Sequence, residues 1–164
     1  MMVSVGAEGS GLGGYSYDPD NISDAAGRFT VTKVPRGPIE IRCMPQDMDS
    51  DLLWLNVART IGGGTIDLGD LVVVRKRLKD GEPAGKLGVT LERRAAGFEI
   101  ASIDANGSAA RSELRVGDVI TSVDGLDYAT RDSDMMDVMR ARAGTMLALG
   151  LARGVTVNVA LAAP

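Results

Sequence analysis

Short runs of alternating or β-branched apolar residues, separated by Gly, Pro and Asp turns, recur along the chain and constrain its fold more than any other feature. In the first half such runs occupy residues 28–32, 39–43 and 53–57. Alternation with a period of two is typical of strands that bury one face. The 21 glycines fall in short clusters without a period, which suits turns between strands. The sequence therefore predicts a mainly β protein with two short helices.

Turn signals also divide the chain into two parts. The stretch 80–84 (DGEPA) is rich in turn formers, and we expect it to link a first domain, residues 1–79, to a second domain, residues 85–164. The remaining predicted strands lie at 65–68, 71–77, 89–91, 98–103, 119–123, 146–149 and 155–161. The helices are expected at 108–113, with Ser108 as N-cap, and at 133–142, ended by Gly144.

Several chemistries are excluded by composition. The sequence contains no histidine, which removes Ser-His and Cys-His catalysis and His-ligated zinc. Its single cysteine, Cys43, lies in an alternating run and is predicted to be a buried small hydrophobe. The acidic loops at 18–24 and 47–51 lack the order of an EF-hand. We therefore expect no enzyme activity, no catalytic residue, no metal site and no cofactor.

Charge and hydropathy limit the partners in the same way. The net charge is -4 and only 4% of the residues are aromatic, so neither half offers the basic face and stacking side chains of a nucleic-acid binder. The basic run at 75–79 is interpreted as a solvated strand end or linker. No apolar run reaches the ~20 residues that span a bilayer, so we expect no direct membrane insertion. No signal peptide is evident after Met1.

The first half resembles a known β module. The phrase DAAGRFTV at 24–31, followed by VPRGPIEI at 34–41 and IDLGDL at 66–71, is similar to the carboxypeptidase regulatory-like module, a transthyretin-like β-sandwich. The resemblance covers about residues 20–77 and implies a supporting spacer without chemistry. The family's opening strands precede this phrase, so either 3–5 supplies such a strand or the module is truncated.

The second half resembles a PDZ domain of the bacterial, protease-associated type over residues 85–161. KLGV at 86–89 stands where the family has its carboxylate-binding loop, and SAAR at 108–111 where it has a short helix. LRVGDVITSVDG at 114–125 follows the long family signature almost letter for letter, except that Glu113 precedes it where a Gly is common. The resemblance implies a partly open β-barrel, in which Asp118 and Asp124 fix turns.

The resemblance also implies one wall of a peptide groove. Glycine lets a loop curl so that successive amides point toward an anion, here the amides of Leu87, Gly88 and Val89 toward a terminal carboxylate. The peptide then adds as a strand. Lys86 either attracts the carboxylate or is a solvated loop charge. The predicted peptide-binding residues of this wall are Lys86, Leu87, Gly88, Val89, Thr90 and Leu91.

The helix at 133–142 is expected to form the opposite wall. Met135 and Met139 share one face with Val138 beside them, a pattern that fits either plain core or a pocket for the last peptide residue. Ser133 occupies the first pocket position in place of the histidine found in some relatives. The expected partners are protein or peptide C-termini that end in an apolar residue.

These features favour a non-catalytic module that binds C-terminal or extended peptides, with a β-sandwich spacer. The alternative is the regulatory, substrate-recognition tail of a larger envelope or secreted protease, for which the resemblance implies a periplasmic or extracellular location. A third reading makes both halves passive structural parts with a closed groove.

Overall fold

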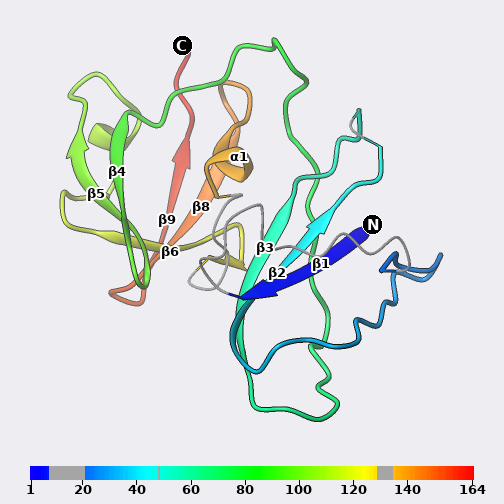
Figure 1. The fold of residues 1–164 in the computed structure, drawn as a ribbon. Helices are drawn as coiled ribbons and strands as arrows, with labels where there is room; N and C mark the ends of the chain where they lie inside the picture. The colour runs from blue at the N-terminus through cyan, green and yellow to red at the C-terminus, as the bar shows by residue number, and fades with distance from the viewer. Residues whose placement is uncertain (8–20, 48, 129–134) are drawn as a thin grey trace. The chain divides into compact units, whose positions relative to one another are not determined.

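The computed structural model describes residues 1–7, 21–47, 49–128 and 135–164, and it is mainly β, as predicted (Figure 1). The chain divides into two compact units: a first over Met1–Arg75, and a second over Lys76–Thr130 and Met135–Pro164. The predicted linker at 80–84 lies inside the second of these units. Within the described residues no helix is long and apolar enough to span a membrane.

The first unit is built on one antiparallel sheet in the order β1-β2-β3. Its strands are β1 (Met2–Ala7), β2 (Gly37–Met44) and β3 (Leu55–Ile61). Residues that face one another across the strands lie on the same side of the sheet, so the alternation in sequence collects the apolar side chains on one face. The buried residues of this face are Val3, Ile39, Ile41, Cys43, Leu55 and Val57.

The layer over this face differs from the prediction. Residues 28–32, 65–68 and 71–74 form no strand, and Arg75 makes only an isolated bridge to Leu52. Phe29, Val31 and Leu71 nevertheless pack against the buried cluster, and a cavity of about 1070 Å³ lies between these segments and the sheet. Alternation decides which side chains face the core but supplies no hydrogen-bonding partner for the backbone. The β-sandwich thus stays a prediction.

The second unit contains a six-stranded antiparallel sheet in the order β4-β5-β6-β8-β9, with β7 paired to β6. Its strands are β4 (Val89–Arg94), β5 (Gly97–Ile103), β6 (Val119–Val123), β7 (Leu126–Asp127), β8 (Met146–Leu151) and β9 (Thr156–Ala160). All five predicted strands of this half are present. The fully buried core includes Ile100, Ile120, Val123, Leu147 and Leu149.

Both helices of this unit are shorter than predicted. The first is a single 3₁₀ turn, η2 (Ala109–Arg111), and the Ser108 side chain makes no cap hydrogen bond. The Ser108 hydroxyl instead donates to the carbonyl of Lys86, at 3.3 Å. The second, α1 (Met135–Met139), ends before 142, and the Ala141 carbonyl beyond it accepts a hydrogen bond from the Gly85 N–H. The predicted start of this helix at 133 lies outside the described residues. Figure 1 shows α1 in orange, and its packing partner is β6.

Candidate functional site

The loop that leads into β4 has its carbonyl groups fixed from within the molecule. The carbonyl of Leu87 accepts a hydrogen bond from the Ala109 N–H at 2.9 Å, and that of Gly88 accepts one from the Asp104 N–H at 2.8 Å. The carbonyl of Lys86 accepts one from the Ala162 N–H at 2.9 Å. The three successive carbonyls of Lys86, Leu87 and Gly88 are therefore held, in that order, by Ala162 just after β9, by η2 and by the turn after β5.

The amide groups of the same loop have no such partners. Across the part of the chain that the structure describes, the N–H groups of Leu87 and Gly88 meet no acceptor. Val89 lies opposite Ile103, and the bond from the Asp104 N–H to the Gly88 carbonyl makes them a non-hydrogen-bonded pair. In such a pair the N–H points away from the partner strand. The loop thus presents three consecutive donors, the arrangement that suits an anionic group.

Two glycines make this loop geometry possible. Gly88 has φ +76°, a conformation that favours glycine. A Cβ atom at Gly88 would lie 2.6 Å from the Cα of Gly107, and one at Gly107 would lie 2.7 Å from the Cα of Gly88. The two backbones touch directly, so neither position has room for a side chain. Gly107 was not predicted as part of the site; the Asn106-Gly107 turn signal was its only trace in the sequence.

Strand β4 continues from the loop as one end of the sheet order, so its outer side is an open edge within the described residues. Val89 and Leu91 are half-buried, whereas Thr90 between them is exposed. The Thr90 hydroxyl accepts a hydrogen bond from the Ser102 hydroxyl at 2.9 Å across the β4–β5 pair. A peptide that adds here would pair with the backbone of β4 and contact the side chains of Val89 and Leu91.

The predicted helical wall is closed to solvent in this structure. Met135, Val138 and Met139 are buried, with exposed fractions of 0%, 2% and 8%, while Met136 is exposed. This burial fits the alternative in which the methionines belong to the core. Ser133 lies outside the described residues. A groove lined by α1 therefore stays a prediction, as does peptide binding by the loop and β4.

The chain that follows α1 nevertheless lies close to the start of the loop. The Gly85 N–H donates to the Ala141 carbonyl at 2.8 Å, one residue before Lys86. The Lys86 side chain is exposed and makes no ion pair with any described residue. Both readings of Lys86, an attractive charge near the donors and a solvated loop charge, remain compatible with this position.

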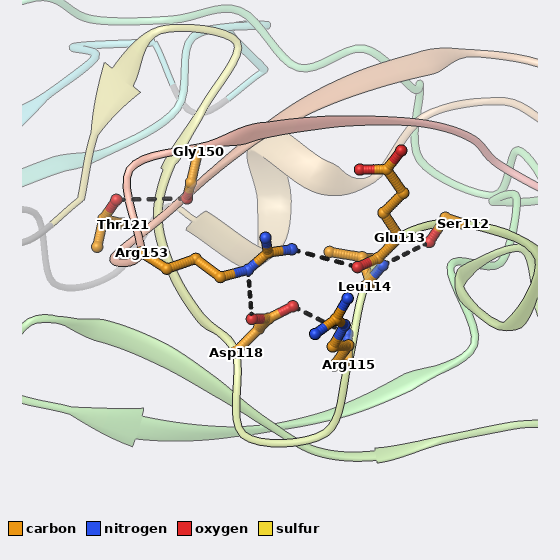
Figure 2. A network of polar contacts seen from close by, with 8 residues as sticks. All are labelled: Ser112, Glu113, Leu114, Arg115, Asp118, Thr121, Gly150 and Arg153. Carbon is orange, nitrogen blue, oxygen red and sulfur yellow. Dashed lines mark hydrogen bonds and ion pairs between the residues drawn. The ribbon is translucent and has the colours of Figure 1, made fainter.

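The two signature aspartates act as structural ties. The Asp118 carboxylate is buried and accepts hydrogen bonds from the Arg115 N–H and from the Arg153 guanidinium, both at 2.9 Å (Figure 2). The Asp124 carboxylate accepts one from the Ala148 N–H at 2.8 Å. The Asp118 carboxylate thus holds the turn at 115–118, as predicted, whereas the Asp124 carboxylate ties the β6–β7 turn to β8.

Cys43 is 3% exposed, on the core face of the first unit. Burial raises the pKa of the Cys43 thiol to about 11, and because the thiolate is the reactive form, a neutral buried thiol is a poor nucleophile. This confirms the prediction of a buried apolar cysteine. Within the described residues no group of three acidic or cysteine side chains comes together as a metal site.

Comparison with known families agrees with this geometry. Residues 85–161 match the family model of the PDZ domain. The match supports a PDZ domain over the segment that holds the donor loop, β4 and α1, and it suggests a peptide-binding, protein-interaction module there. The carboxypeptidase regulatory-like resemblance of the first half has no corresponding family match. A comparison with curated proteins gives no match to the chain.

Proposed function

We propose that the PDZ domain captures the C-terminus of another polypeptide. The single observation that carries the proposal is the run of three N–H donors at Leu87, Gly88 and Val89, which meet no acceptor among the residues that the structure describes. Hydrogen bonds from such donors to a carboxylate are charge-assisted and roughly twice as strong as neutral ones. The peptide then pairs with the open edge of β4, which supplies affinity independent of sequence.

Binding rather than catalysis is the second part of the proposal. The sequence has no histidine, its one thiol is buried with a raised pKa, and Asp118 and Asp124 are held by backbone and arginine partners. An apolar last residue is the proposed preference, since Val89 and Leu91 are the half-buried side chains beside the donors.

The experiment compares free and amidated peptides. The isotope-labelled full chain is titrated with a library of peptides that end in apolar residues, and amide shifts are mapped by NMR. We expect the shifts to centre on 87–91. Amidating the peptide terminus is expected to weaken binding about tenfold or more, because hydrogen bonds to charged groups contribute about 1.5–3 kcal/mol.

Each outcome bears on a separate element of the proposal. Shifts centred elsewhere in the second unit would overturn the assignment of the site. Equal affinity for free and amidated peptides would overturn carboxylate capture and leave strand addition alone.

A further inference from the structure

Residues 76–84, here called the strap, include part of the run interpreted as a solvated strand end or linker and the predicted linker at 80–84, and they lie in the second unit. Arg77 forms an ion pair with Asp124 in the β6–β7 turn. Leu78 is buried, with an exposed fraction of 8%. Glu82 forms an ion pair with Arg142 at 2.6 Å. The strap therefore belongs to the peptide-binding unit although it precedes the residues that match the PDZ family.

The contacts at the end of the strap meet the chain that follows α1. Arg142 lies three residues beyond the last residue of α1, and the neighbouring Ala141 carbonyl accepts the Gly85 N–H. Gly85 is closely packed, because a Cβ atom there would lie 2.7 Å from the Cβ of Leu161 and 2.9 Å from the backbone nitrogen of Ala143. The strap is thus fixed against the chain that follows α1, immediately before the donor loop begins.

Glu82 is suited to hold this position. Its carboxylate accepts hydrogen bonds from Arg142 and from the Lys79 N–H, at 2.6 and 3.1 Å. The hydrogen bond from Arg142 lowers the pKa of Glu82 from its usual value, so the carboxylate is charged at neutral pH. Glu82 shows 28% of its side chain to solvent and Arg142 69%. An ion pair this exposed contributes little to global stability, and its effect is expected in local geometry.

We propose that Glu82 and Arg142 are a positioning pair that holds the chain after α1 against the strap, just before the donor loop, so that peptide affinity depends on a contact between two residues that touch no peptide. The proposal rests on the proposed function of the loop. It names two residues that touch no ligand and act through the chain at 85–89.

The experiment measures peptide affinity in the full chain. A peptide that ends in an apolar residue with a free carboxylate is titrated against wild type, Glu82→Gln, Arg142→Gln and the double variant. Glutamine at 82 keeps an oxygen for the Lys79 N–H, so that only the ion pair changes. We expect each single variant to bind about fivefold more weakly, within the range of effects of residues remote from a ligand. The double variant is expected to be no weaker than either single one, as for a coupled pair.

Charge reversal separates positioning from simple electrostatics. Glu82→Arg combined with Arg142→Glu restores an ion pair in the opposite sense and is expected to recover most of the affinity. Matched controls are Glu113→Gln and Arg111→Gln, exposed side chains of the same unit that form no ion pair with any described residue. These controls are expected to bind as wild type does.

The outcomes distinguish this proposal from the one on which it rests. If wild type binds no C-terminal peptide, the proposed function fails. If wild type binds and all variants bind equally, only the positioning role is overturned. Tighter binding by Glu82→Gln would also overturn it, because a freed Arg142 charge would then be attracting the carboxylate directly.

Discussion

At the scale of single residues, the contact between Gly88 and Gly107 shapes the candidate site. It lets the turn after β5 press against the loop, so that the Asp104 N–H reaches the Gly88 carbonyl at 2.8 Å. That bond in turn directs the Val89 N–H toward the open edge. The absence of side chains at Gly88 and Gly107 therefore determines the direction of the N–H donors in the loop.

Gly88→Ala is expected to remove most peptide binding and to lower stability. Alanine at φ +76° costs about 1–2 kcal/mol for the left-handed conformation alone. Its Cβ would also overlap the Cα of Gly107 at 2.6 Å, so the loop has to move. Peptide affinity and the urea midpoint of the variant check both effects.

Gly117→Ala provides the matched comparison. Gly117 has φ +89° but open space around its Cβ position, so this variant carries the conformational strain without the overlap. It is expected to lose stability and keep its peptide affinity. Equal peptide affinities for the two variants would contradict the role assigned to the glycine contact.

At this scale the sequence indicated the residues of the loop, whose role in peptide binding stays a prediction, but not the contacts that support the loop. The Gly88 position and the run 86–91 followed from a resemblance to a family loop, and the structure places these residues together. Gly107, Ser108 and Ala162 could not be predicted as neighbours of the loop, because their contacts join residues distant in sequence. The burial of Met135 and Met139 was also undecided, since a methionine stripe looks the same whether it lines a core or a pocket.

At the scale of elements, the turn between β8 and β9 is tied to the start of β6. Arg153, in that turn, donates to the Asp118 carboxylate at 2.9 Å and to the Glu113 carbonyl at 3.2 Å (Figure 2). Asp118 also receives the Arg115 N–H. One buried carboxylate thus joins two segments that are far apart in the sequence.

Asp118→Ala is expected to lower the free energy of unfolding of the second unit by about 2–3 kcal/mol, because it leaves Arg153 and the Arg115 N–H without their charged acceptor. Asp118→Asn keeps one acceptor oxygen and is expected to cost less. Urea unfolding of both variants measures the difference. An unchanged midpoint for Asp118→Ala would show that the tie adds nothing to stability.

Predictions of strands succeeded where the chain supplied a partner. The runs at 98–103 and 119–123 lie in β5 and β6, and the run at 39–43 lies in β2. The run at 28–32 has the same alternation and the same inward side chains, yet it forms no ladder. The alternation of apolar residues determines which side chains face the core. Whether a run pairs as a strand depends on a neighbouring strand that the local sequence does not reveal.

At the scale of the whole molecule, the chain consists of two units with separate buried clusters. The first collects Val3, Ile39 and Ile41 on its sheet, and the second collects residues such as Ile100 and Leu147. The candidate site, the strap and the PDZ match all belong to the second unit. Defects in the first core are therefore expected to leave the site intact.

Ile41→Ala tests this separation. Ile41 is 1% exposed, and truncating a buried Ile costs about 2–5 kcal/mol. We expect faster amide hydrogen exchange across β1 to β3 with unchanged exchange in β4 to β9 and an unchanged peptide dissociation constant. Weaker peptide binding by this variant would instead mean that the two cores unfold as one cooperative block.

The open side of β4 also has a cost in solution. A strand edge that can pair with a peptide can also pair with the same edge of a second copy of the protein. Such edge-to-edge pairing is a route to aggregation in β-sheet proteins. The far end of β4 is guarded by Glu92, Arg93 and Arg94, whose charges oppose such pairing. The near end, at 89–91, carries no charge. The proposed peptide-binding edge and the tendency to self-associate therefore both lie at residues 89–91.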